Sequence, residues 1–161
     1  MVREELTADP GWVADAALDP WLLVSDGPGS ALFGYATGHP ATGGLAWTLS
    51  TPVRQLDTHR SRAVTASGRR YDLGRRIDVS KLPDEEARFA YALLVCPIIG
   101  SDPAAHLGSA DPLLAADWVR ACKMARHLGV TPPERDVDAL SAFLQRHADA
   151  YFILMRRKLG Y

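Results

Sequence analysis

The sequence predicts an α+β fold in which a β-rich segment, residues 20–79, precedes a helical segment, residues 80–158. In the first segment, apolar residues alternate at a period of two, as in Leu45, Trp47 and Leu49, which is typical of half-buried strands. In the second, apolar residues recur at helical spacing, and acidic residues and prolines stand where helices begin. We therefore expect an N-terminal antiparallel meander of four to five short strands, packed on a C-terminal layer of three helices.

A short helix is expected before the first strand. Asp9 would cap this helix, Pro10 would occupy its first turn, and Asp19-Pro20 would end it. The apolar run at residues 21–24 then predicts a strand, which turn-forming residues connect to a second strand over residues 31–36.

Three further strands are expected, over residues 45–56, 62–66 and 70–74. Pro52 cannot donate a hydrogen bond to a neighbouring strand, so it predicts either an edge strand or a bulge. Three helices are expected after them, over residues 84–96, 112–128 and 131–157. Pro97 would end the first helix and Gly129 the second, with a loop over residues 98–111 between the two.

Size and composition predict one domain over residues 1–161, because each half of the chain would be only marginally stable alone. No apolar stretch approaches the ~20 residues that a membrane helix needs. The N-terminus also lacks the apolar core of a signal peptide, so we expect a soluble, cytoplasmic protein. We expect Cys96 and Cys122 to be buried free thiols.

Metal-binding and catalytic motifs are missing from the sequence. The five histidines show no pairing at four-residue spacing, and there is no Cys-x-x-Cys, so we expect no metal and no cofactor. There is no P-loop and no Gly-x-Ser-x-Gly, and we assign no catalytic residue. We therefore favour a non-enzymatic protein, while a small enzyme that uses His39, His59 or His106 remains an alternative.

The most informative feature is a basic segment, residues 51–81, with eight basic and three acidic residues between acidic flanks. Together with the loop residue His39, its arginines form the candidate binding set: Arg54, Arg60, Arg62, Arg69, Arg70, Arg75 and Arg76. A solvated sheet face is the simplest interpretation. The alternatives are phosphate contacts with nucleic acid and docking onto an acidic protein surface. Only Tyr71 could offer a base a stacking surface, which weakens the nucleic-acid interpretation.

Residues 38–74 also contain several short motifs. These are Gly38-His39-Pro40, Ser50-Thr51-Pro52-Val53, Leu56-Asp57, Ala63-Val64-Thr65-Ala66-Ser67-Gly68 and Tyr71-Asp72-Leu73-Gly74. This pattern resembles small, mostly uncharacterised accessory proteins encoded by proteobacterial phages and plasmids. The resemblance implies an accessory factor and assigns no functional residue. Our leading hypothesis is a protein-binding factor, in the manner of an anti-CRISPR inhibitor of a host defence system, with a protein partner and no membrane association.

Overall fold

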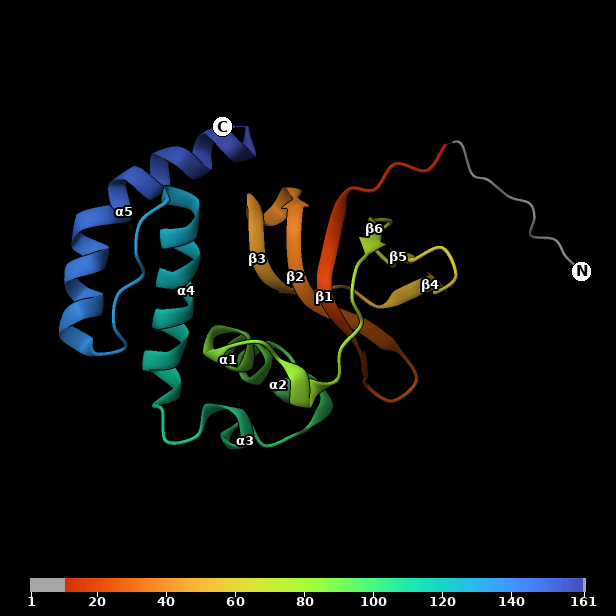
Figure 1. Ribbon diagram of the computed structural model, residues 1–161, viewed down its shortest axis with the longest axis horizontal. Coiled ribbons are helices and arrows are strands. Elements are labelled where there is room, and N and C mark those ends of the chain that lie inside the picture. The colour runs from red at the N-terminus through yellow and green to blue at the C-terminus, as the bar shows by residue number, and fades with distance from the viewer. Residues whose placement is uncertain (1–10, 161) are drawn as a thin grey trace, which may run out of the picture.

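The computed structural model describes residues 11–160, and these form a mixed sheet and helices, in agreement with the predicted α+β class (Figure 1). The strands are β1 (Ala16–Ser25), β2 (Ser30–His39), β3 (Gly44–Leu49), β4 (Val53–Asp57), β5 (Arg62–Thr65) and β6 (Arg70–Leu73). The helices are α1 (Glu85–Leu94), α2 (Cys96–Ile99), α3 (Ala104–Leu107), α4 (Pro112–Leu128) and α5 (Val137–Leu159). No helix in this described part of the chain is long and apolar enough to cross a membrane.

The sheet has the strand order β3-β2-β1-β6-β5-β4. Two antiparallel units, β1–β2–β3 and β4–β5–β6, are joined by a parallel pairing of β1 with β6, in which Ala16 lies opposite Tyr71 and Leu18 opposite Leu73. The prediction of a purely antiparallel meander is therefore wrong. Because of this parallel join, the consecutive strands β3 and β4 lie at opposite edges of the sheet.

The predicted N-terminal helix is also wrong where the structure describes it; Asp9 and Pro10 lie outside the described residues. Ala16 and Leu18 are buried strand residues, and the Leu18 carbonyl accepts a hydrogen bond from Gly74 N–H at 2.8 Å. These contacts with β6 outweigh the helical preference of an alanine-rich stretch. Pro20 stands where the pairing of β1 with β2 shifts register, a position that tolerates the missing donor.

The helical half matches the expected helices at α1 and α4 and differs elsewhere. Pro97 occupies the first turn of α2, where its missing N–H costs nothing, and α3 lies within the predicted loop. The last helix begins at Val137 rather than near Thr131, because the Asp136 carboxylate accepts a hydrogen bond from Ala139 N–H at 2.9 Å and caps it there.

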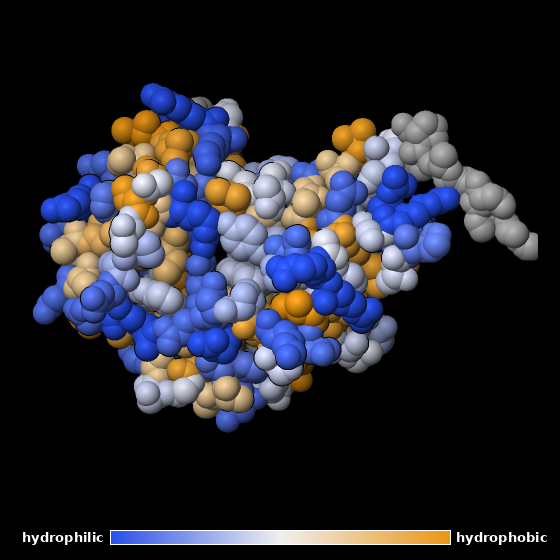
Figure 2. All heavy atoms as spheres, in the orientation of Figure 1, coloured by the Kyte–Doolittle hydropathy of each residue, from blue (hydrophilic) through white to orange (hydrophobic). Residues whose placement is uncertain are grey.

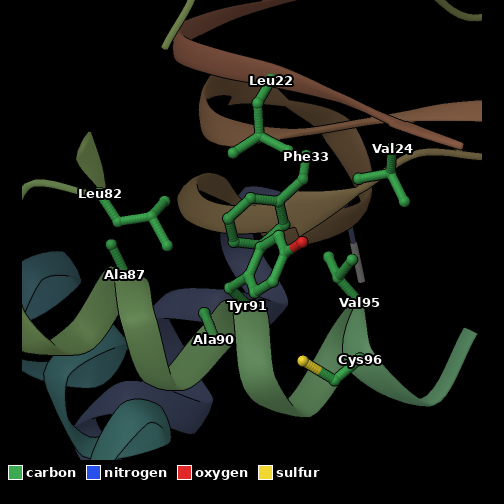
Figure 3. Close-up of a cluster of buried hydrophobic side chains, with 9 residues drawn as sticks. All are labelled: Leu22, Val24, Phe33, Leu82, Ala87, Ala90, Tyr91, Val95 and Cys96. Atoms are coloured by element: carbon green, nitrogen blue, oxygen red, sulfur yellow. The ribbon is translucent and has the colours of Figure 1, made fainter. Parts of the chain in front are cut away.

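Phe33 is at the centre of the core between β1–β3 and the helices (Figure 3). Its side chain is fully buried, stacks on Trp47 with ring centroids 5.4 Å apart, and meets the edge of Tyr91 at 5.5 Å. The next residue along β2, Leu32, belongs to a second cluster with Trp21 on the opposite face of the sheet. The sheet is therefore buried on both faces, and the helices cover one of them.

Two motifs that carry the resemblance have structural contacts of their own. A Cβ atom added to Gly74 would collide with the side chain of Asp19, so this position requires glycine. Thr51 Oγ1 accepts a hydrogen bond from Ser67 N–H at 3.2 Å and joins the start of β4 to the turn after β5. Packing and turn geometry therefore account for these residues without a ligand.

Candidate functional site

A cleft of about 370 Å³ lies between the edge strand β3 and the helices α1 and α4. Its walls are largely apolar and are formed by Ala46, Trp47, Ala90, Leu93, Leu94, Ala116 and Val119. Three charged residues also line it: Glu86, Arg120 and Lys123. Figure 2 shows hydrophilic residues along the line where the helices meet the strands. An apolar cleft with a few convergent charged groups is the usual form of a small-molecule site.

An ion pair between Glu86 of α1 and Arg126 of α4 lies beside this cleft. The side chains are only 13% and 25% exposed, and Arg126 Nη2 donates to Glu86 Oε1 while the guanidinium stacks 5.2 Å from the Tyr35 ring centroid. Burial raises the pKa of Glu86, although the hydrogen bond and charge of Arg126 act in the opposite direction. The other terminal nitrogen, Arg126 Nη1, is buried and has no hydrogen-bond partner in the described part of the chain.

Lys123 precedes Arg126 by one helical turn and lines the cleft. Burial, and secondly the charge of Arg126, lower the pKa of its ammonium group. Lys123 forms no ion pair with any of residues 11–160. Its side chain is therefore a partly desolvated cation without a counter-ion. Burying such a charge costs free energy unless a ligand supplies the counter-ion.

His127 of α4 and Lys158 of α5 add an imidazole and a further cation to Lys123 and Arg126. Lys158 Nζ lies 2.9 Å from His127 Nδ1 and can only donate, so the neutral ring carries its hydrogen on Nε2. This Nε2 is buried, and the Leu45 backbone offers it an acceptor. Burial lowers the pKa of His127, as do the charges of Lys158 and Lys123. A hydrogen bond to the Leu45 backbone acts in the opposite direction and raises it.

His39 ends β2 and is 5% exposed. Its Nδ1 accepts a hydrogen bond from Ala41 N–H at 3.1 Å, which places the hydrogen of the neutral ring on Nε2. This Nε2 lies 3.2 Å from the Tyr71 hydroxyl oxygen and 3.2 Å from Arg69 Nη1. The His39 Nε2–H and the Arg69 guanidinium are therefore two donors beside the Tyr71 hydroxyl. Burial lowers the pKa of His39, followed by the charges of Arg69 and Lys123.

We call these six side chains the cationic cluster: His39, Arg69, Lys123, Arg126, His127 and Lys158. The C-terminal end of α5 brings its members together, because Met155 packs against Gly43 in the turn after His39, and His127 lies beside the same glycine. Lys123 is close enough for its charge to lower the pKa of both histidines. The C-terminal ends of α4 and α5 offset part of the mutual repulsion through their helix dipoles.

The arginines predicted from the basic segment have several different local partners. Arg62 and Arg70 lie 4.8 and 5.8 Å from the ring centroid of Trp12, and Arg60 lines the same shallow pocket. Arg70 also pairs with Asp15, and Arg75 with Asp19 at 3.3 Å.

The remaining members of the predicted set have other partners. Arg76 stacks over Trp21 at 5.2 Å, and Arg54 donates to the Ala66 carbonyl at 3.1 Å. Only Arg69 and His39 join the cationic cluster. Tyr71, which we considered as a stacking surface for bases, is buried. Binding of nucleic acid through this segment stays a prediction.

Sequence reasoning missed Lys123, Arg126, His127 and Lys158. The spacing Lys123-x-x-Arg126-His127 was the available signal, because residues three and four apart share one helix face, here on a helix that is otherwise packed through apolar residues. Both cysteines are free and buried, as predicted, and burial raises the pKa of Cys122 to about 12. Residues 11–160 contain no group of three histidine, cysteine or acidic side chains that could hold a metal ion.

No family model matches the chain, and neither the curated proteins nor the solved structures include a significant match to it. The resemblance of residues 38–74 to phage and plasmid accessory proteins therefore stays a prediction. The case for function depends on the geometry of the cleft and of the cationic cluster.

Proposed function

We propose that this protein binds a small amphipathic anion, with the apolar part of the ligand in the cleft and its acidic group against the cationic cluster. The observation that carries the proposal is Arg126 Nη1, a buried donor in a group of like charges that has no hydrogen-bond partner in the described part of the chain. An unsatisfied buried donor costs about 1–3 kcal/mol, and a bound anion would remove this cost.

The electrostatics of the site support an anionic ligand. Glu86 is the one carboxylate in the described residues that forms an ion pair with a member of the cationic cluster, and Arg126 already occupies it. Lys123 and both histidines have a lowered pKa, so the site disfavours further positive charge and would gain from an acceptor. Groups with shifted pKa values that line a cleft are typical of functional sites.

The cleft supports an apolar part in the ligand. Trp47, Leu93 and Val119 present apolar surface in a volume of about 370 Å³, which suits a ring or a short chain. Phenyl phosphate combines both features, whereas phenol lacks the charge and inorganic phosphate lacks the ring. We expect phenyl phosphate to bind more tightly than either of them, which calorimetric titration measures.

Lys123→Met should raise the Kd of phenyl phosphate at least about tenfold, because it removes a charge-assisted contact at the mouth of the cleft. Lys81→Met is the matched control, since Lys81 is an exposed lysine outside the cationic cluster. Equal affinities for phenyl phosphate and phenol, or equal losses in the two variants, would refute the proposal.

A second candidate function is docking onto an acidic protein surface, which continues the hypothesis of a protein-binding accessory factor or host-defence inhibitor. The observation that favours it is the outer side of α5, where Phe152 and Ile153 are 63% and 54% exposed. Arg156 lies over the Phe152 ring at 5.8 Å, and Arg157 adds a further cation. Apolar groups bordered by cations would suit a partner that carries carboxylates.

The second candidate predicts that Phe152→Ser combined with Arg156→Glu abolishes recovery of a stoichiometric partner. Affinity purification with the wild-type chain and this variant measures the effect. Arg146→Glu, another charge reversal on the same helix, serves as the control. A partner that both variants retain equally would exclude this surface.

A further inference from the structure

We propose that Lys123 is a nucleophilic amine, which forms an imine with the carbonyl group of a small carbonyl-bearing anion bound in the cleft. This inference rests on the proposed function insofar as the cleft holds the anion. It goes further by assigning a covalent step and the chemical class of the ligand, an aldehyde or ketone with a carboxylate or phosphate group.

The geometry presents Lys123 to a ligand. Lys123 and Arg120 both line the cleft from α4, three residues apart, and Arg126 lies three residues further on. Residues three apart share a helix face, so Lys123 lies on the same side of α4 as Arg126, whose charge acts on it, while the Arg120 guanidinium pairs with Asp117 at 2.9 Å. Ala46 and Trp47 line the same cleft with apolar surface. A carbonyl compound anchored by its anionic group would therefore have its carbonyl carbon near Nζ.

Of the groups near Lys123, Arg126 favours the neutral amine, and Arg120 is paired with Asp117. Arg120 and Arg126 lie on the same helix, and His39 and His127 are close enough to sense its charge. Glu86 faces the cleft from α1 but is paired with Arg126. Burial and the Arg126 charge lower the pKa of the lysine. Desolvation next to another cation is a known way for a protein to obtain a nucleophilic lysine.

The step is a condensation that needs no oxidant or reductant. The lone pair of Nζ forms a bond to the carbonyl carbon, and the π electrons of the C=O bond move to oxygen. Transfer of a proton from nitrogen to oxygen gives a carbinolamine. The nitrogen then forms a second bond to carbon, the C–O bond breaks, and one water molecule leaves with the second nitrogen-bound hydrogen.

The chain offers an internal comparison, because its only lysines are Lys81, Lys123 and Lys158. Glyoxylate, an anionic aldehyde, and propanal, a neutral one of similar size, serve as probes in the presence of cyanoborohydride. This reagent reduces the imine to a stable secondary amine, which peptide mass spectrometry locates. At neutral pH we expect glyoxylate to label Lys123 at least about tenfold faster than Lys81, because the cleft would hold the anionic aldehyde beside Nζ of Lys123 and Lys81 lies outside the cleft.

Phenyl phosphate should slow the labelling of Lys123 by glyoxylate and leave Lys81 unaffected. Lys123→Arg removes the amine, so the rapid labelling at this position should be lost while Lys81 is still labelled at its wild-type rate. If Lys123 reacts no faster than Lys81, or reacts faster only with propanal, the inference is overturned. Tight binding of phenyl phosphate in that case would leave the proposed function intact, and rapid labelling by glyoxylate without phenyl phosphate binding would refute only the proposed function.

Discussion

Replacing Phe33 by alanine should lower the free energy of unfolding by about 3–5 kcal/mol, the usual cost of removing a large buried aromatic side chain. Phe33 is fully buried and contacts Trp47 and Tyr91 through its ring. Its removal would leave a cavity between the sheet and α1. Because Trp47 also lines the cleft, the loss should weaken phenyl phosphate binding as well.

Urea denaturation followed by circular dichroism measures the effect of Phe33→Ala. Phe152→Ala is the matched control, because it deletes the same atoms from a side chain that is 63% exposed. We expect the control to change the free energy of unfolding by no more than about 0.5 kcal/mol. Similar losses in the two variants would contradict the packing of β2 against the helices.

Arg126→Met should lower the free energy of unfolding by about 3 kcal/mol at neutral pH, because it leaves the Glu86 carboxylate buried without its partner. Glu86→Gln in the same background should restore much of the loss, since a neutral amide is less costly to bury than a charge. The double-mutant cycle from urea denaturation gives the coupling energy directly.

The pH dependence of this variant has a definite sign. Burial already raises the pKa of Glu86 in the wild-type protein, and loss of Arg126 should raise it further. A raised carboxyl pKa means that the folded state binds more protons than the unfolded state, so stability falls as pH rises above the unfolded pKa. The cost of Arg126→Met should therefore be larger at neutral pH than in mild acid. Losses that are additive in the cycle and constant with pH would contradict the ion pair.

Local patterns in the sequence predicted most of the strands and helices, because these depend on neighbouring residues. The alternation at Leu45, Trp47 and Leu49 corresponds to β3, and the acidic first turn after Asp84 corresponds to α1. The parallel pairing of β1 with β6 involves residues more than fifty positions apart, such as Ala16 and Tyr71. No periodicity within either strand identifies such a partner.

The charge pattern is explained in part by contacts within the chain. The acidic first part of the chain and the basic middle part are complementary to one another, and the pairs Asp15–Arg70 and Asp19–Arg75 join them along the same β1–β6 junction. Two arginines of the candidate binding set, Arg70 and Arg75, therefore have partners within the chain, and binding through the set stays a prediction. The cationic cluster could not be predicted because its members come from separate elements that meet only when α5 packs against the turn after β2.

Binding of an anion at the cationic cluster can be tested most directly by nuclear magnetic resonance of the histidine rings, titrated over pH with and without phenyl phosphate. The account predicts that the ligand raises the pKa of His39 and His127. Burial lowers both pKa values most, and a bound anion would offset the neighbouring positive charges that lower them further. His59, in the exposed turn after β4, and His147, packed against Phe143 on α5, should be unaffected. Unchanged titration curves for His39 and His127 at saturating ligand, or equal shifts at all four histidines, would contradict the account.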